Sequence, residues 1–74
     1  MMSELNPPTL QAVGEALYGW RWRSPLARDL DVAVRTVQRW RAGDRAIPAT
    51  LADDLRSLLE ENKMEIERLL TVIN

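Results

Sequence analysis

Apolar residues recur at three- and four-residue steps along most of the chain, a spacing that places them on one face of a helix. The first stripe consists of Leu10, Val13, Leu17 and Trp20. Either Asn6 or Thr9 fits the helix start, because both side chains accept backbone hydrogen bonds and a proline fits the first turn. We therefore expect a first helix at about residues 7–19, which Gly19 ends.

Two shorter helical segments follow the first. Ser24 and Pro25 form a helix start signal, with the serine as the cap and the proline at the first helical position. We expect a second helix at residues 24–31 and a third at residues 33–42, because Gly43 is typical of the residue after a helix. The positions of this pair that we expect to be buried are Leu26, Ala27, Leu30, Val32, Val37 and Trp40.

The last apolar stripe alternates steps of three and four residues up to the end of the chain, which is the spacing of a coiled-coil seam. It consists of Ala52, Leu55, Leu59, Asn62, Ile66, Leu69 and Ile73. Pro48 opens this segment. One helix over residues 48–73 fits the pattern, and so does a pair of helices with a break at Glu61 and Asn62. The expected fold class is therefore all-α, with four or five helices.

Much of this last stripe has no partner inside one chain. Leu51, Leu55 and Leu58 can pack against the preceding helices, but the apolar residues beyond them exceed what a domain of 74 residues covers. A second copy would supply the missing surface, and Asn62 would then fix the register of the seam at some cost in stability. The sequence predicts a homodimer whose interface contains Leu59, Asn62, Ile66, Leu69, Leu70 and Ile73.

The composition indicates one small domain, residues 1–74, with a body at residues 7–47 and a packing and dimerisation segment at residues 48–74. Apolar residues make up 46% of the chain and charged residues 28%, which is typical of a folded soluble protein. No apolar run approaches the roughly 18 residues of a membrane span. The N-terminal residues lack the pattern of a secretory signal. We therefore expect a cytoplasmic protein that does not enter membranes.

Cysteine and histidine are both absent from the chain. Their absence excludes disulfides and the usual zinc sites, in which these side chains ligate the metal. It also excludes catalysis by a nucleophile paired with an imidazole, and no other catalytic grouping occurs. We therefore expect no enzymatic activity, no metal and no cofactor.

Charge is distributed unevenly along the chain, although the formal net charge is only −1. Residues 20–45 contain seven arginines and three aspartates, which leaves +4. Residues 48–74 contain six carboxylates and three cations, which leaves −3. Local charge governs the attraction of a polyanion more than total charge does. Because every cation of the basic segment is an arginine, which pairs with phosphate and guanine through two hydrogen bonds, this segment favours a nucleic-acid partner.

Residues 26–43 have the sequence Leu-Ala-Arg-Asp-Leu-Asp-Val-Ala-Val-Arg-Thr-Val-Gln-Arg-Trp-Arg-Ala-Gly. This run resembles the helix-turn-helix of the lambda-repressor and Cro-like family of bacterial and phage DNA-binding proteins, and the resemblance covers roughly residues 10–58. It implies that the third helix is a recognition helix that enters the major groove of DNA. Asp31 stands where the family usually has glycine, and Ala33 stands where it usually has a capping serine.

With Val37 and Trp40 buried, a rotation of about 100° per residue turns one set of side chains on the third helix outward. That set is Arg35, Gln38, Arg39 and Ala42. Arginine can bind guanine, and glutamine adenine, through paired hydrogen bonds. We therefore expect the two arginines and the glutamine of this set to contact bases. The residues expected to contact the DNA backbone or to flank the base contacts are Arg23, Ser24, Val34, Thr36, Arg41 and Arg45.

The residues around Trp22 have two interpretations. Arg23 and Ser24 open the second helix, where backbone N–H groups can hold a phosphate. Trp22 lies between two arginines, a setting that fits base stacking. We favour core packing between the first and second helices for Trp22, and core packing for Trp40 as well.

The combined expectation is a homodimeric repressor that binds double-stranded DNA at an inverted-repeat operator through the major groove. A small regulator from a phage or another mobile element fits the family and the size. The alternative is a protein-interaction module, such as an antitoxin whose acidic C-terminal helix binds a partner protein. The fate of four apolar residues near the C-terminus distinguishes the two functions, since they pair with themselves in one case and with a foreign chain in the other: Ile66, Leu69, Leu70 and Ile73.

Overall fold

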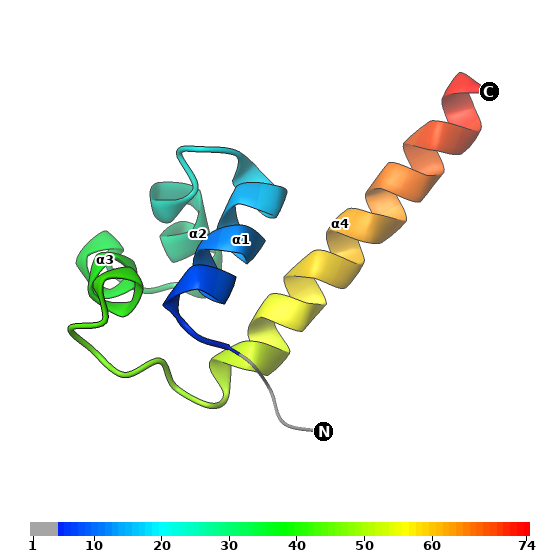
Figure 1. Ribbon diagram of the computed structural model, residues 1–74. Coiled ribbons are helices and arrows are strands. Elements are labelled where there is room, and N and C mark those ends of the chain that lie inside the picture. Colours follow the sequence, from blue (N-terminus) through cyan, green and yellow to red (C-terminus); the bar gives the residue numbers. More distant parts are fainter. Residues whose placement is uncertain (1–4) are drawn as a thin grey trace.

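Four helices and no strand make up residues 5–74, the part of the chain that the computed structural model describes (Figure 1). The helices are α1 (Pro7–Tyr18), α2 (Arg23–Leu30), α3 (Val34–Ala42) and α4 (Leu51–Ile73). The all-α class predicted from the sequence is confirmed. The N-terminal residues in which the sequence shows no secretory signal include residues 1–4, and these four lie outside the described residues.

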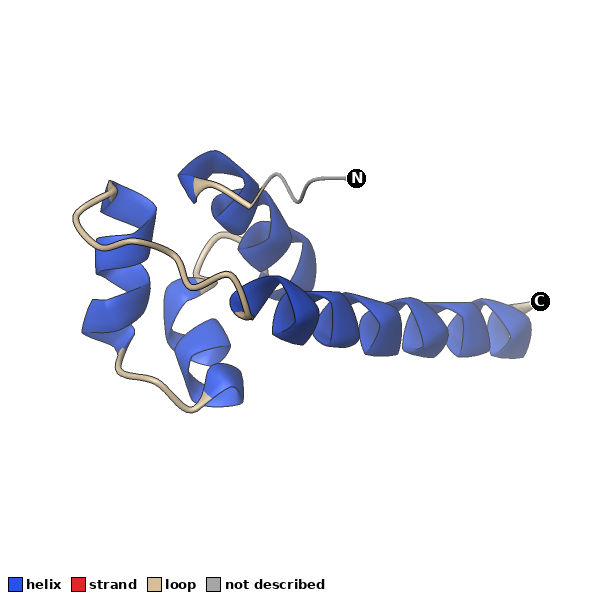
Figure 2. Ribbon diagram, turned by 90° about the horizontal axis from the view of Figure 1, so that it is seen from below, coloured by secondary structure: helices blue, strands red, loops and turns tan. Residues whose placement is uncertain are grey.

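The first three helices and the start of α4 form one body, and the rest of α4 extends far beyond it (Figures 1 and 2). Helix α1 packs against each of the other three helices, and α2 packs against α3. The principal extents of 45 × 30 × 19 Å reflect the projecting helix. No helix in the described part of the chain combines the length and the apolar character needed to cross a membrane.

The ends of α1 follow the sequence signals. Asn6 is the N-cap, and its Oδ1 accepts a hydrogen bond of 2.9 Å from the backbone N–H of Thr9. Gly19 follows the helix at a φ of 83°, a conformation that side chains other than glycine rarely adopt. This glycine turns the chain away from the helix axis, and the first stripe ends with it.

Two expectations about the next residues are wrong. Trp20 does not continue the apolar stripe of α1, because the turn at Gly19 leaves 74% of its surface exposed. Ser24 does not cap α2: the helix begins at Arg23, and the capping position belongs to Trp22, whose side chain makes no capping hydrogen bond. The backbone of Trp22 is already helical, so Ser24 lies within the first turn.

The connection between α2 and α3 is a short, hydrogen-bonded turn. Asp31 adopts the left-handed conformation, with φ at 58° and ψ at 46°. Its N–H donates to the carbonyl of Arg28, and the N–H of Val32 donates to the carbonyl of Ala27 over 2.9 Å. These two bonds are the Schellman arrangement that closes helix ends. Ala33 opens α3 without a side-chain cap, as its methyl group requires.

The core contains eight buried apolar residues drawn from all four helices and the turn before α2. They are Leu10, Trp22, Leu26, Ala27, Val37, Trp40, Leu51 and Leu55. The expected burial of Trp22 and Trp40 is confirmed, with exposures of 1% and 4%. Leu30 and Val32 are half-buried against this core. The α2–α3 pair is therefore anchored to α1 and α4 through its inner face.

Helix α4 is a single helix, which decides between the one-helix and two-helix alternatives. Its predicted start at Pro48 is wrong by three residues. The N–H of Leu51 donates to the carbonyl of Pro48 over 3.1 Å, so that residues 48–50 form a turn before the helix. Leu51 and Leu55 are buried and Leu58 is half-buried, as the sequence predicts.

Candidate nucleic-acid interface

The outward face of α3 contains the residues that the sequence predicts for base contacts. Arg35, Gln38 and Arg39 are all exposed, while Val37 and Trp40 are buried on the opposite side. Since the buried pair fixes the rotation of α3 about its axis, the three polar side chains must leave the body together. The helix ends at Gly43, whose φ of 83° closes it in the left-handed conformation.

The six residues predicted as flanking contacts divide into two groups. Ser24, Val34 and Arg45 are exposed, and Arg23 and Thr36 are half-buried. Arg41 is half-buried too, and its Nε donates to Oε1 of Gln11 on α1. Arg41 therefore ties α3 to α1, and a contact of this residue with a nucleic acid stays a prediction.

A depression brings the turn before α2 together with the outer face of α3. It is lined by Trp20, Arg21, Arg23, Ser24, Val34 and Gln38. The sequence predicts four of these six residues as part of a DNA-binding surface. Of the other two, Arg21 belongs to the basic segment that favours a nucleic-acid partner, and the spacing of Trp20 predicts that it belongs to the apolar stripe of the first helix.

The arginines of this face are free of ion pairs within the described residues. The ion pairs of residues 5–74 join Arg28 with Asp29, Arg56 with Asp53, and Arg68 with Glu65. None of them uses an arginine from the outer face of α3 or from the turn before α2. Guanidinium groups without a carboxylate partner remain available to bind an anion such as phosphate.

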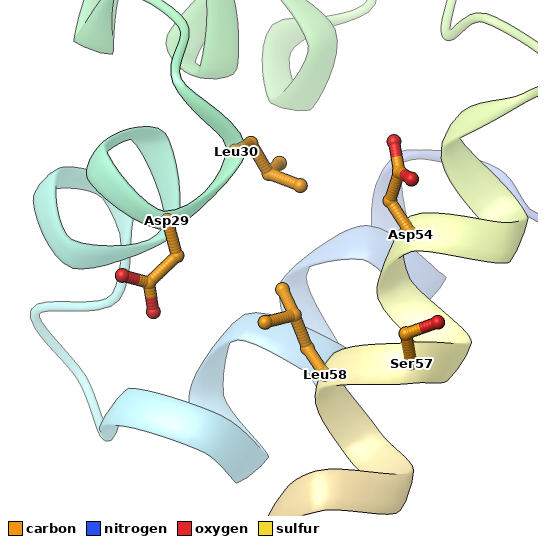
Figure 3. Close-up of a pocket in the computed structure, with 5 residues that line it drawn as sticks. All are labelled: Asp29, Leu30, Asp54, Ser57 and Leu58. Atoms are coloured by element: carbon orange, nitrogen blue, oxygen red, sulfur yellow. The ribbon is translucent and has the colours of Figure 1, made fainter.

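A second depression, between α2 and α4, has the opposite character (Figure 3). Leu30 and Leu58 point into it from the two helices, and the carboxylates of Asp29 and Asp54 lie at its edge. No cation lines it. A depression lined by two carboxylates and no cation does not fit a polyanion.

Asp29 is held in place by Tyr18. The phenol of Tyr18 donates a hydrogen bond of 2.6 Å to Oδ2 of Asp29, which joins the end of α1 to α2. Burial raises the pKa of Tyr18 above its ordinary value, and the hydrogen bond to Asp29 raises it further. The neutral phenol is therefore the stable form, and the bond supports the packing of α2 that positions α3.

The predicted dimerisation residues lie on the projecting part of α4. Leu59 and Asn62 are half-buried, whereas the apolar residues beyond them are exposed. The exposed residues of the predicted interface are Ile66, Leu69, Leu70 and Ile73. They continue the helical stripe that Leu51 and Leu55 bury against the body. The apolar face of α4 thus runs past the end of the core, and no other segment of residues 5–74 covers it.

The sequence-based prediction missed two features of α1 and the turn that follows it. Gly14 is buried in α1, where a Cβ atom would overlap the indole of Trp22. A glycine inside a helical pattern is a signal for such a close approach. The exposed position of Trp20 follows from Gly19, which ends the helix before it.

In comparisons with protein-family models, with curated proteins and with solved structures, nothing matches this chain.

Proposed function

We propose that this protein is a sequence-specific DNA-binding regulator in which α2 and α3 form a helix-turn-helix of the lambda-repressor and Cro-like type. The observation that carries the proposal is the outer face of α3. Arg35, Gln38 and Arg39 leave this helix together, and the burial of Val37 and Trp40 fixes their direction. In the proposed complex α3 lies in the major groove, where its side chains meet base edges.

The chemistry of the three side chains supports contact with bases. A guanidinium group can donate two hydrogen bonds to O6 and N7 of guanine, and an amide can pair with N6 and N7 of adenine. Arg35 and Arg39 have no ion pair within residues 5–74 that would compete with a base. We infer that these two arginines prefer guanines and that Gln38 prefers an adenine.

A second copy of the chain completes the proposed regulator. The exposed apolar stripe on α4 continues the buried stripe of the core, and a second α4 with the same stripe would cover it. A two-fold dimer presents two copies of α3 to the DNA, so its operator is an inverted repeat with half-sites about one DNA turn apart. A repressor of the cytoplasm of a bacterium, or of a phage or mobile element within it, fits this arrangement.

Binding of a fluorescently labelled duplex, measured by anisotropy at low salt, tests the proposal. The Arg35→Ala and Arg39→Ala variants should each weaken binding, because each removes a cation from the proposed interface. The matched control is Arg56→Ala, which removes the same charge from an exposed site on α4. Equal affinity of all four proteins for duplexes, or no binding by the parent protein, would contradict the proposal.

The projecting part of α4 also supports one alternative, an antitoxin-like module whose α4 binds a foreign protein. Its exposed apolar residues and the net charge of −3 over residues 48–74 favour a basic partner with an apolar groove. The two functions predict different states for the purified protein. A regulator should be a dimer by itself, whereas the antitoxin-like module should remain a monomer until its partner is added.

A further inference from the structure

Trp20 is an unusual surface residue in this protein. The other two tryptophans are almost fully buried, yet Trp20 exposes 74% of its surface. Gly19 directs it outward, because the turn at this positive-φ glycine breaks the stripe that would have carried Trp20 into the core. Exposing a large aromatic ring to water is unfavourable by itself, so the ring is free to gain energy by contacting a partner.

The guanidinium group of Arg21 lies over the face of this ring. Its Cζ is 4.4 Å from the centroid of the Trp20 indole, a distance at which a guanidinium group is attracted to the face of an aromatic ring. The stacking places a positive charge against one face of a flat apolar ring on the α1–α2 turn. A partner that fits both groups must offer an anion next to an apolar surface.

The depression that contains this pair connects it to α3. Gln38 and Val34 form the wall on the side of α3, and Arg23 adds a second guanidinium group. No carboxylate lines the depression, so nothing in it repels an anion. The deoxyribose-phosphate backbone of DNA presents phosphates and apolar sugar carbons in alternation. This alternation matches the two arginines of the depression and the apolar surfaces of Trp20 and Val34.

We propose that Trp20 and Arg21 form a second DNA contact, which packs on the sugar–phosphate backbone at the edge of the groove in which Gln38 contacts a base. This inference rests on the proposed function. In the complex the indole covers a deoxyribose, and Arg21 and Arg23 bind the phosphates on either side of it. The contact strengthens binding to every sequence alike and sets the register of α3, because phosphate and sugar contacts carry no base information.

The three tryptophans make a direct test available. Acrylamide is a neutral quencher that reaches exposed indoles, so Trp20 accounts for the quenchable fluorescence while Trp22 and Trp40 are shielded. A random-sequence duplex at low salt is the probe. The expected result is that the duplex reduces quenching of the parent protein to the level of a Trp20→Phe variant.

Affinity for the same duplex provides the second measurement. Trp20→Ala should weaken binding about tenfold without changing the sequence preference, since tenfold is within what burial of a large side chain contributes. Because Trp20 is exposed, this variant should keep the melting temperature of the parent. The matched control is Met64→Ala, which removes a similarly exposed apolar side chain from α4 and should leave affinity unchanged.

Four results would overturn the inference. In the first, the duplex binds without reducing the quenching of the parent protein and with the same affinity for Trp20→Ala as for the parent. In that case the backbone contact lies elsewhere and the proposed function stands. If no duplex binds, the proposed function fails and this inference fails with it. Protection of Trp20 that grows with protein concentration without DNA would assign the depression to a second copy. Stronger protection by single-stranded DNA would assign the ring to base stacking.

Discussion

The backbone of Gly14 on α1 lies against the indole ring of Trp22, with no room between them for a methyl group. The contact brings α1 close to the residue that precedes α2, and Trp22 fills the space that this approach creates. Trp22 is the largest of the fully buried side chains. The position of α2, and with it that of α3, therefore depends on Gly14, because only a residue without a side chain lets Trp22 pack directly on the backbone of α1.

Gly14→Ala should destabilise the protein. Alanine raises helix propensity by up to about 1 kcal/mol, but overpacking a rigid core costs about 1–3 kcal/mol. We expect the overlap with Trp22 to prevail, because the ring is buried and cannot move aside. The melting temperature, followed by circular dichroism, should fall by about 10 °C.

A double-mutant cycle provides the control for this prediction. In a Trp22→Leu background the ring is absent, so Gly14→Ala should no longer be destabilising. A Gly14→Ala variant that melts above the parent protein would show that helix propensity decides and that the close approach is unimportant.

Truncation after Glu60 should convert the protein into a monomer or an unfolded chain. The truncation removes the exposed apolar residues of α4, which continue the buried stripe formed by Leu51 and Leu55. Sedimentation equilibrium gives the mass directly. A truncated chain that remains a stable dimer would place the interface elsewhere.

Single substitutions test the same interface in the full chain. Leu69→Lys should weaken the proposed dimer by at least about a hundredfold, because it removes from each copy a leucine that the dimer would bury and adds two charges. The control is Met64→Lys, which adds the same charge about 140° away around the helix. Equal dissociation of both variants would indicate a general charge effect.

The predicted and observed structures agree best where the apolar spacing along one helix determines which residues are buried. The buried positions of α3 could be predicted because Val37, Trp40 and the stop at Gly43 follow from local spacing. The outward direction of Arg35, Gln38 and Arg39 then follows from the same geometry.

The errors arise where the backbone leaves regular helix geometry or where distant residues meet. The spacing of the α1 stripe predicts that it continues to Trp20, but the positive φ of Gly19 ends the periodicity before that residue. The sequence predicts Ser24 as the cap of α2, but the backbone of Trp22 is already helical and the helix begins at Arg23. The role of Gly14 depends on a tertiary contact with Trp22, which spacing along one helix cannot reveal.

DNA binding should depend strongly on salt despite the net charge of −1. Each phosphate that the protein neutralises contributes about 0.9 to the slope of log affinity against log salt. Arg23→Ala should therefore reduce the slope by nearly 2 per dimer and weaken all sequences alike. The Arg56→Ala control should keep the slope of the parent. Affinity that barely changes from low to moderate salt would contradict the proposed role of the basic face.

Stability should decline at alkaline pH because of Tyr18. Its pKa is raised in the folded state, so the phenol's contribution is complete below the ordinary pKa of 10.0 and is lost as the pH rises above it. Since Tyr18 is the only tyrosine, phenolate absorbance reports its ionisation without ambiguity. That absorbance should appear together with the loss of helical circular dichroism.

Tyr18→Phe is the matched variant for this pH dependence. It should cost about 0.5–1.5 kcal/mol at neutral pH, because Asp29 loses one hydrogen bond but remains open to water. It should also flatten the alkaline decline in stability. A phenol that ionises near pH 10.0 in the folded parent protein would contradict the assignment.

The proposed base contacts of α3 can be tested position by position with substituted proteins. Gln38→Ala and Arg39→Ala should each lose the preference for one base in both half-sites while the protein stays folded. Each lost contact should cost about 1–3 kcal/mol of discrimination, and a symmetric dimer loses two. Val37→Ala and Trp40→Ala should instead lower the melting temperature, because each leaves a cavity in the core.

Selection of bound sequences from random duplex DNA by the purified protein tests the central claim most directly. The account predicts an enriched inverted repeat with half-sites about one DNA turn apart. It also predicts that the Arg35→Ala, Gln38→Ala and Arg39→Ala proteins each select repeats in which one position of each half-site has lost its base preference. An unenriched pool from the parent protein would contradict the account. So would folded variants of all three residues that select the same repeat as the parent protein with equal discrimination.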